Sequence, residues 1–497
     1  MPLQLLICLF AGALIAPSLA PLNIPFLALI PPAALYLCSQ NRSPKQAAWL
    51  GWLFGVGFFG TGVSWVFVSI SEHSATPLPV AIAITSLFVM GLATLFALQN
   101  YLWLKCFGAR LLPLSFIGIW ILFEWLRSWF LTGFPWLYLG NTALGTPIQN
   151  LLPVGGVWLA SFAFLVLAIC LAELLKNRKV LPILIFPLPL IGSYLLPPSW
   201  TTEQEKPLDV AIVQPNIPQS IKWLPEYRNE ILAGYEQLTK DHLDTTLMLW
   251  PETAIPALFR NAAKPLANIL NDLDRNHVTL ISGMPSVVPD SQHPKGYRAH
   301  NSLAVLTTGS GIYHKQRLVP FGEYIPMEAY LRGTIDFFNL PMSSFSLPIG
   351  NQPSLKVGEY TLAPAICYEI AYPELVRVST QNADFILTVS NDTWFGDSIA
   401  PAQHLQIAQV RALENGRWVI RGTNNGISAV INHHGEIVDK LPQFEAAVLR
   451  TQAQAMAGQT PFQTYGSLPI LILSGLMTVF GLGSRKRSAT NPYPSFS

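Results

Sequence analysis

Three side chains that could act together in nucleophilic catalysis follow short apolar runs in the second half of the chain. Cys367, Glu252 and Lys315 each come at the end of a run that is typical of a buried strand. A thiol needs a base to take its proton, and the oxyanion that it creates needs a cation or hydrogen-bond donors. A carboxylate and an ammonium group meet these needs, so the three strand ends together predict a site for covalent catalysis at Cys367.

The placement of the cysteines favours Cys367 as the nucleophile. Of the five cysteines, Cys8, Cys38 and Cys170 lie in long apolar stretches, Cys106 lies at the end of one, and Cys367 lies elsewhere. A single thiol in a polar domain is typical of a nucleophile but also of a buried structural residue, and the count leaves both interpretations open. The helix-like stretch from Pro373 would place Cys367 on a strand-to-helix turn, where the helix N-terminus favours a thiolate or an oxyanion.

Histidine is the usual base for a thiol, and eight histidines lie beyond residue 200. None has a recognisable protease context, and the sequence has no HExxH pattern. We expect these histidines at the surface or hydrogen-bonded in the core, and we predict neither a metal nor another cofactor. The eight residues are His242, His277, His293, His300, His314, His404, His433 and His434.

The elements that must position these side chains are those of a layered α/β domain, expected at residues 205–455. The linker Pro197–Glu205, rich in proline, serine and threonine, fits its boundary. Strand-like runs interspersed with helix-like stretches are typical of such a domain. The expected strands are Asp209–Gln214, Thr246–Trp250, Val278–Gly283, Ser302–Thr307, Gly311–His314, Thr361–Ile366, Asp384–Ser390, Trp418–Arg421 and Ile427–Asn432. The expected helices are Glu226–Lys240, Lys264–Asn276, Pro373–Asn382 and Ala402–Gly416.

The rest of the chain has the composition of a membrane protein. In the whole chain 12% of residues are charged, 51% are hydrophobic and the mean hydropathy is +0.37. This composition excludes a disordered chain, a disulfide-rich secreted domain and a typical nucleic-acid-binding protein. A membrane-spanning helix needs about 20 mostly apolar residues, and we predict eight, seven within residues 1–198 and the eighth at 467–483. The spans are expected near residues 3–20, 22–39, 47–70, 77–104, 112–131, 152–175, 180–197 and 467–483.

Lysine and arginine residues predict how these spans are oriented. Basic residues follow the second, fourth, sixth and eighth spans, and the short loops after the first, third and fifth contain none. Because basic loops stay in the cytoplasm, both termini, including the tail 484–497, would be cytoplasmic, and the α/β domain would lie outside. The basic residues are Arg42, Lys45, Lys105, Arg110, Lys176, Arg178, Lys179, Arg485, Lys486 and Arg487.

Glu124 and Arg127 form a pair of opposite charges inside the fifth predicted span. They are three residues apart and so share one helix face. Two interpretations remain open, namely mutual neutralisation within the helix bundle and a polar contact with a lipid headgroup or another domain.

The strand-end motifs are similar to those of a known superfamily. Trp250-Pro-Glu-Thr, Tyr313-His-Lys with Glu323 eight residues later, and Ile366-Cys-Tyr-Glu resemble the glutamate, lysine and cysteine motifs of the nitrilase superfamily. With the flanking spans, nearly the whole chain resembles the apolipoprotein N-acyltransferase family. Other stretches similar to that family are residues 132–137, 214–223, 391–396 and 421–426.

The resemblance implies a fold and a set of roles. The fold would be an αββα sandwich of nitrilase type joined to an eight-helix transmembrane domain. Glu252 would be the general base, Lys315 would stabilise the tetrahedral intermediates, and Cys367 would be the nucleophile. A second essential carboxylate, Glu323, would position the lysine or assist proton transfer. The residues with supporting roles would be Trp223, Tyr368 and Glu369.

The reaction that the resemblance implies is ping-pong. A phospholipid would give its sn-1 acyl chain to the cysteine as a thioester, and the N-terminal amine of the diacylglyceryl-cysteine of an apolipoprotein would then take it. The expected partners are this phospholipid, this apolipoprotein and the membrane bilayer, with no nucleic acid. We expect a monomer in the bacterial inner membrane, with the catalytic domain in the periplasm.

Other interpretations remain open on the residues alone. A membrane-anchored amidohydrolase of the nitrilase type would use the same three residues with water as acceptor. A transporter with an external domain would have several intramembrane polar residues and paired broken helices, and this chain has few such residues. The apolar stretch 337–347 either packs under the domain or forms a mobile lid that dips into the membrane.

Overall fold

The structure is a computed structural model that describes residues 1–497 except 74–75, 108–111, 178–179, 294, 332–343 and 489–497. Arg110, Arg178 and Lys179 of the predicted basic loops, residues 337–343 of the predicted lid and residues 489–497 of the predicted tail lie outside the described residues. The chain divides into two compact units. A helical unit comprises residues 1–65, 82–198 and 464–497, and an α/β unit comprises residues 66–81 and 199–463.

Within the described residues, the α/β unit contains two six-stranded sheets, with orders β12-β1-β2-β3-β4-β5 and β11-β10-β9-β8-β7-β6. The strands of the first sheet are β1 (Thr202–Gln214), β2 (Leu247–Leu249), β3 (Thr279–Pro289), β4 (Tyr297–Val305), β5 (Ile312–His314) and β12 (Ala447–Ala457). Those of the second are β6 (Leu355–Val357), β7 (Tyr360–Ile366), β8 (Phe385–Ser390), β9 (Trp418–Thr423), β10 (Ala429–Ile431) and β11 (Ile437–Lys440).

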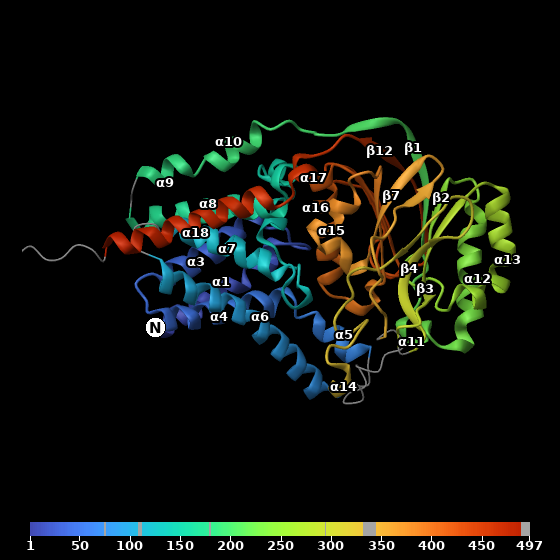
Figure 1. The fold of residues 1–497 in the computed structure, drawn as a ribbon, viewed down its shortest axis with the longest axis horizontal. Helices are drawn as coiled ribbons and strands as arrows, with labels where there is room; N and C mark the ends of the chain where they lie inside the picture. Colours follow the sequence, from blue (N-terminus) through green and yellow to red (C-terminus); the bar gives the residue numbers. More distant parts are fainter. Residues whose placement is uncertain (74–75, 108–111, 178–179, 294, 332–343, 489–497) are drawn as a thin grey trace, which may run out of the picture. The chain divides into compact units, whose positions relative to one another are not determined.

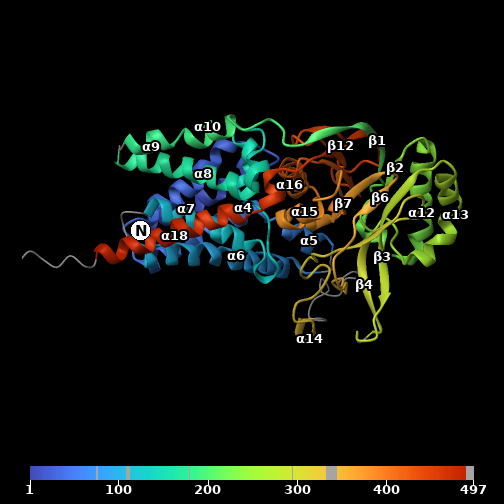
Figure 2. The same ribbon diagram turned by 45° about the horizontal axis from the view of Figure 1, so that its top comes forward.

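The two sheets face each other between two layers of helices (Figures 1 and 2). Ile212 and Leu249 of the first sheet share one buried cluster with Leu387 and Ile420 of the second. The other face of the first sheet packs against α12 (Arg228–Thr239) and α13 (Phe259–Arg275). Helices α15 (Pro373–Ser379) and α16 (Ala400–Asn415) contact β7 and β9 of the second sheet. Strands such as β8 are covered on both faces, which explains their apolar runs without alternation.

The direction of the strands brings several carboxyl ends to one edge of each sheet. Strands β1, β2 and β3 are parallel, and β7, β8 and β9 are parallel. Strand β4 is antiparallel to β3, and β5 is antiparallel to β4, so β5 runs in the same direction as β3. Strands β2 and β5 of the first sheet therefore end at the same edge. All nine expected strands and four expected helices are present with shifted ends, and β6, β11 and β12 were not predicted.

The helical unit is built around closely packed helices. The contact between α1 (Pro2–Ala13) and α4 (Pro44–Gly62) depends on glycine, because a Cβ on Gly12 would lie 2.1 Å from the Phe54 carbonyl oxygen. Small residues of this kind let membrane helices approach each other. The other α-helices with residues in this unit are α2 (Ile15–Ser18), α3 (Ile30–Ser39), α6 (Leu78–Cys106), α7 (Leu112–Arg127), α8 (Leu152–Asn177), α9 (Val180–Ile185), α10 (Leu188–Tyr194), α17 (Pro461–Tyr465) and α18 (Leu468–Ser488).

The eight predicted spans are not confirmed. Among the described residues, two helical stretches are long and apolar enough to cross a membrane, Leu78–Cys106 and Gln149–Asn177. A third is counted if α4 and the following α5 (Val66–Glu72) form one bent span. Four other predicted spans are shorter apolar helices, at residues 2–18, 25–39, 180–194 and 468–481. Proline contributes to this shortening, since Pro187 lies between α9 and α10 and has no N–H to continue a helix.

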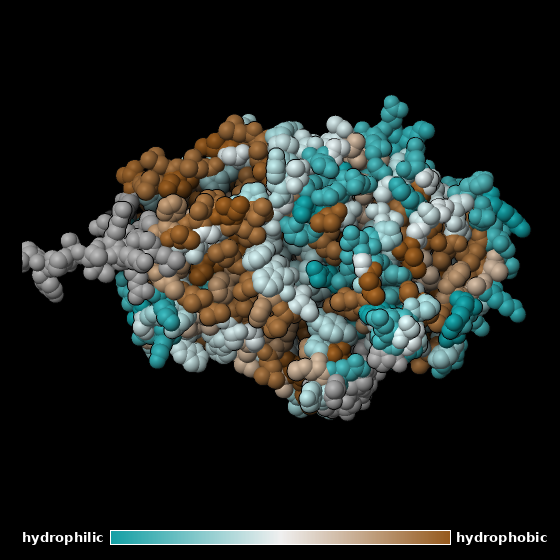
Figure 3. Space-filling model, in the orientation of Figure 1, coloured by the Kyte–Doolittle hydropathy of each residue, from teal (hydrophilic) through white to brown (hydrophobic). Residues whose placement is uncertain are grey.

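The surface of the helical unit is nevertheless strongly apolar. Figure 3 shows hydrophobic side chains gathered over α9, α10 and α18. They include Leu184 and Leu188, which are 63% and 56% exposed, and Phe480, which is 67% exposed. Continuous apolar surface of this kind is rare on soluble monomers and fits contact with lipid.

The charged pair inside the fifth predicted span is internal. Glu124 and Arg127 of α7 are both buried, with Nη2 of Arg127 3.9 Å from Oε1 of Glu124. The Glu124 carboxylate accepts from the backbone N–H of Leu139 at 2.8 Å, and Arg127 donates to the carbonyl of Leu137 at 3.3 Å. The pair therefore neutralises itself, as one of the two interpretations expected, and it also holds an irregular backbone segment.

Candidate active site

Cys367 occupies the strand-to-helix turn that the sequence predicts. Strand β7 ends at Ile366, a short 3-10 helix spans Cys367–Ala371, and α15 begins at Pro373. The φ angle of Cys367 is +53°, in the left-handed region that is unfavourable by roughly 1–2 kcal/mol for a residue with a Cβ. Strain of this kind is concentrated at functional sites, where the surrounding structure holds it in place.

Glu252, Lys315 and Glu323 form one buried cluster of charges. Nζ of Lys315 is 2.9 Å from Oε1 of Glu323 and 3.4 Å from Oε1 of Glu252. The three residues are between 1% and 5% exposed. Because solvent does not screen these contacts, the ammonium group is fixed between two carboxylates, and two of the three strand-end residues, Glu252 and Lys315, lie together.

Asn301 and two backbone groups complete this cluster. Nδ2 of Asn301 donates to Oε1 of Glu252 at 2.7 Å and to Oε1 of Glu323 at 2.9 Å. The N–H of Asn391 donates to Oε2 of Glu252 at 2.9 Å, and the N–H of Val319 donates to Oε2 of Glu323 at 2.8 Å. Each of the two carboxylates therefore accepts hydrogen bonds at both of its oxygen atoms. Sequence reasoning missed Asn301, although the pairing of β4 with β5 places it opposite Lys315.

The electrostatics of the cluster favour a charged lysine and a neutral thiol at rest. Burial lowers the pKa of Lys315, but the carboxylates of Glu323 and Glu252 outweigh it and leave the pKa well above its usual value. Burial raises the pKa of the Cys367 thiol well above its usual value, and Glu252 raises it further, while Lys315 opposes them. The Cys367 thiol is therefore neutral at rest, and the Glu252 carboxylate is close enough to contribute to its raised pKa.

Glu369 connects the turn at Cys367 to the segment that contains Lys315 through hydrogen bonds. Its Oε2 accepts from the N–H of Ile366 at 2.7 Å and from the Tyr313 hydroxyl at 3.0 Å. Its Oε1 accepts from the N–H of Gln316 at 2.5 Å and from that of Arg317 at 3.1 Å. Burial raises the pKa of Glu369 to about 7, although the N–H of Ile366 and the charge of Lys315 lower it.

The other predicted supporting residues lie near these elements. Trp223 directly follows α11 (Gln219–Lys222), and its buried indole nitrogen makes no hydrogen bond to the described residues. Lys222, which sequence reasoning missed, donates from Nζ to the backbone carbonyl of Glu252 at 3.1 Å. Tyr368 is half-buried and makes an edge contact with Tyr372, with ring centroids 5.2 Å apart.

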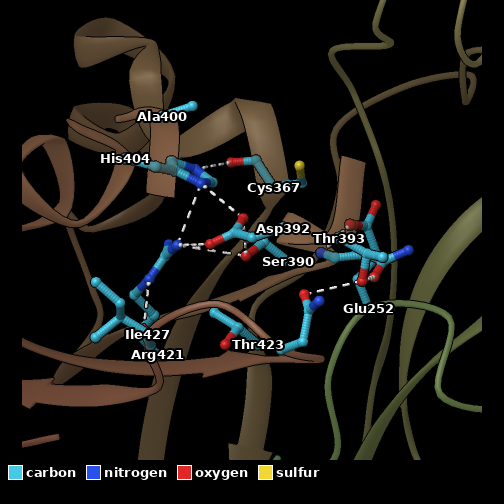
Figure 4. A network of polar contacts seen from close by, with 12 residues as sticks. Glu252, Cys367, Ser390, Asp392, Thr393, Ala400, His404, Arg421, Thr423 and Ile427 are labelled. Carbon is cyan, nitrogen blue, oxygen red and sulfur yellow. Dashed lines mark hydrogen bonds and ion pairs between the residues drawn. The ribbon is translucent and has the colours of Figure 1, made fainter. Parts of the chain in front are cut away.

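A second buried network contacts the cysteine turn through His404 (Figure 4). Nε2 of His404 is 3.1 Å from the carbonyl oxygen of Cys367, and Nδ1 is 3.1 Å from Oδ1 of Asp392. Arg421 donates from Nη2 to Oδ2 of Asp392 at 2.8 Å, and the Ser390 hydroxyl donates to Oδ1 at 2.8 Å. Burial raises the pKa of Asp392, but Arg421 and His404 outweigh it and lower the pKa to about 2.

Chemically, the site brings together a thiol, a carboxylate able to take its proton and an ammonium group able to stabilise an oxyanion. Comparison with known proteins places the domain that carries these residues in a class. Residues 209–462 match the family model of the carbon-nitrogen hydrolases, so the α/β unit is a domain of the nitrilase superfamily. Among solved structures, the carbon-nitrogen hydrolase from Helicobacter pylori G27 matches at 17% identity and a TM-score of 0.35, over 56% of this chain and 95% of that chain.

The rest of the chain narrows the class. Residues 11–170 match the model of the apolipoprotein N-acyltransferase N-terminal domain. The apolipoprotein N-acyltransferase of Pseudomonas aeruginosa (strain LESB58) is 42% identical over 97% of this chain and 96% of its own length. Those of Azotobacter vinelandii and Vibrio parahaemolyticus are 41% and 39% identical over 99% and 96% of this chain, and each match covers 97% of the relative. The chain belongs to the apolipoprotein N-acyltransferase family, which confirms the family predicted from the motifs.

Proposed function

We propose that this chain transfers an acyl chain from a phospholipid, through a thioester on Cys367, to the N-terminal amine of the diacylglyceryl-cysteine of an apolipoprotein. The observation that carries the proposal is the position of the Lys315 ammonium group between the Glu252 and Glu323 carboxylates. The charge of this ammonium group also acts on the thiol of Cys367. The names of the relatives support the same reaction.

In the first half-reaction, Sγ of Cys367 attacks the sn-1 ester carbon while Glu252 takes the thiol proton. Lys315 stabilises the oxyanion of the tetrahedral intermediate. When the intermediate collapses, the bond from carbon to the glycerol oxygen breaks and that oxygen takes the proton from Glu252. The products are a lysophospholipid and an acyl thioester on the enzyme.

In the second half-reaction, the neutral amine of the apolipoprotein attacks the thioester carbon and Glu252 takes a proton from the nitrogen. Lys315 again stabilises the oxyanion. The carbon–sulfur bond then breaks, the thiolate takes the proton from Glu252, and the acyl chain leaves as an amide. Glu323 would hold Lys315 in place, and Glu369 would fix the backbone around Cys367. Trp223 and Tyr368 would have supporting roles at the site.

The proposed setting is the bacterial inner membrane, with the catalytic domain in the periplasm and a monomer as the working state. The transmembrane helices one to seven would lie in residues 1–198, the catalytic domain in 205–455, the eighth helix in 467–483 and the cytoplasmic tail in 484–497. The apolar surface over α9, α10 and α18 supports contact with lipid. We propose no metal and no cofactor for the reaction.

Mass spectrometry of the purified full chain tests this proposal. After incubation with a phospholipid, we expect one acyl adduct on Cys367 that hydroxylamine removes, and no adduct in Cys367→Ala. A lipopeptide with a free N-terminal amine should remove the adduct and become N-acylated. Loss of the adduct to water at the same rate with or without the lipopeptide would favour the amidohydrolase. An acyl chain on any other residue would overturn the role of Cys367.

A further inference from the structure

We infer that His404 is a positioning residue that holds Cys367 in its left-handed conformation by donating a hydrogen bond from Nε2 to the Cys367 carbonyl. Figure 4 shows this carbonyl oxygen directed at His404, with the sulfur atom pointing away from the bond. The inference rests on the proposed function, because it concerns the backbone of the proposed nucleophile.

The backbone at Cys367 needs such a restraint. Its φ angle of +53° is unfavourable for a residue with a Cβ, so the turn relaxes unless bonds on both sides oppose it. On one side, the N–H of Ile366 donates to Oε2 of Glu369 at 2.7 Å. On the other side, the carbonyl of Cys367 accepts from Nε2 of His404 at 3.1 Å. The two bonds therefore hold the residue whose sulfur must face the substrate.

The chemistry of the contacts determines which ring nitrogen carries the hydrogen. A carbonyl oxygen can only accept, so Nε2 of His404 must donate to Cys367. In the neutral ring Nδ1 then accepts from Nη2 of Arg421, which lies 3.2 Å away. In the protonated ring Nδ1 instead donates to Oδ1 of Asp392 at 3.1 Å. Both protonation states keep the donor that Cys367 requires.

His404 is itself held in place. Its imidazole is fully buried, and Asp392 and Arg421 beside it are 1% and 0% exposed. Nε of Arg421 donates to the carbonyl of Ile427 at 3.2 Å. Gly426 leaves no free space, since a Cβ there would lie 2.4 Å from Oδ2 of Asp392. A ring anchored in this way can impose a direction on the backbone that it contacts.

The same segment also holds the proposed general base. The backbone N–H of Asn391, the residue before Asp392, donates to Oε2 of Glu252 at 2.9 Å. Residues 390–392 therefore connect to Glu252 through one backbone bond and to Cys367 through Asp392 and His404. This link fixes the position of the Cys367 thiol relative to the Glu252 carboxylate.

A pair of variants in the full chain, purified in detergent, tests the inference. His404→Leu removes the donor, whereas His404→Gln keeps an N–H donor at a similar reach. With a phosphatidylethanolamine donor, we expect the maximal rate of acyl-enzyme formation to fall about tenfold in His404→Leu. A fall of this size corresponds to the loss of somewhat more than the net contribution of one hydrogen bond. The phospholipid concentration for half-maximal rate should stay unchanged, and His404→Gln should restore the rate.

Equal maximal rates in His404→Leu and the unsubstituted protein would overturn the inference, as would a His404→Gln rate as low as that of His404→Leu. If His404→Leu does not fold, His404→Asn replaces it, because its shorter amide does not reach the Cys367 carbonyl. Alkylation of Cys367 by iodoacetamide, followed on its peptide by mass spectrometry, needs no acyl transfer. The alkylation rate of Cys367 in His404→Leu should differ from the rate in the unsubstituted protein, and the rate in His404→Gln should not. This result is expected even if the proposed function fails. Equal alkylation rates in all three proteins would overturn the positioning role.

Discussion

The ammonium group of Lys315 lies closer to Glu323 than to any other carboxylate described, with Nζ 2.9 Å from Oε1. The contact is buried, so it holds the lysine in one direction rather than merely compensating its charge. It also raises the pKa of Lys315 above its usual value, against the opposing effect of burial. Glu323 therefore keeps Lys315 charged and oriented, whereas Glu252 lies further from the ammonium group, at 3.4 Å, and would take the thiol proton in the proposed reaction.

Lys315→Met should abolish most of the acylation of Cys367. Loss of one oxyanion donor costs about a hundredfold or more in rate, and the pKa of Cys367 should rise further because Lys315 lowers it. Single-turnover acylation and iodoacetamide alkylation of Cys367 should therefore both slow down. The exposed lysine of β11 offers a matched control, Lys440→Met, which should leave both rates unchanged. Turnover of Lys315→Met near that of this control would contradict the role of Lys315.

Asn301→Asp should impair the site more than Asn301→Ala. The alanine removes two hydrogen bonds to Glu252 and Glu323, for which we expect acylation to slow by about tenfold. The aspartate adds a third negative charge beside two buried carboxylates, so the rate should fall further. Acyl-enzyme formation measures both variants, and Asn276→Ala at the exposed end of α13 is the control. An aspartate variant more active than the alanine variant would contradict the bridging role.

The strand-end residues were predictable from sequence because their signal is local. Glu252, Lys315 and Cys367 each follow an apolar run, and the strand directions bring such ends to one edge of each sheet. Asn301 has no such signal, since it lies within β4 and reaches the site only through the pairing of β4 with β5. His404 was expected in the core or at the surface, because its contact with the Cys367 carbonyl depends on how α16 packs.

Two parts of the fold were harder to predict for physical reasons. Strand β12 contains Arg450, Gln452 and Gln454 on a sheet edge, so it lacks the apolar run that identifies a buried strand. The predicted spans were counted from composition, but Pro187 separates α9 from α10 and divides one of them into short helices. Apolar composition therefore predicted which residues are helical better than it predicted how long each helix is.

Glu369→Gln should destabilise the α/β unit and slow acylation although the side chain does not touch the reacting atoms. The amide presents an NH₂ group where the carboxylate accepts hydrogen bonds, so donors among Ile366, Tyr313 and Gln316 lose their acceptor. Buried unsatisfied groups of this kind cost about 1–3 kcal/mol each. Thermal unfolding of Glu369→Gln should show a lower Tm than that of Glu374→Gln, which is a matched change at a carboxylate that is 41% exposed. Equal Tm values for Glu369→Gln and Glu374→Gln would show that Glu369 does not hold the turn at Ile366 against the segment from Tyr313 to Gln316.

Lys222 should make stability depend on pH in the alkaline range. Burial lowers the pKa of Lys222 to about 8, against the opposing charge of Glu252, whereas the pKa of an unfolded lysine is 10.5. Between these values the unfolded chain binds more protons than the folded one, so stability rises as pH increases from 8 to 10.5. The contribution is about 3 kcal/mol at most, because each pKa unit corresponds to about 1.4 kcal/mol.

Lys222→Met removes this titration and isolates it from the other groups that ionise in the same range. We expect the difference in Tm between the unsubstituted protein and Lys222→Met to move in favour of the unsubstituted protein as pH rises from 7.5 to 10. Below pH 8 the unsubstituted protein carries a buried charge that the methionine lacks, and above it the neutral amine keeps its hydrogen bond to the Glu252 carbonyl without that cost. Lys264→Met, at an exposed position of α13, should leave the Tm difference independent of pH. A constant difference for Lys222→Met as well would mean that Lys222 titrates like a solvated lysine.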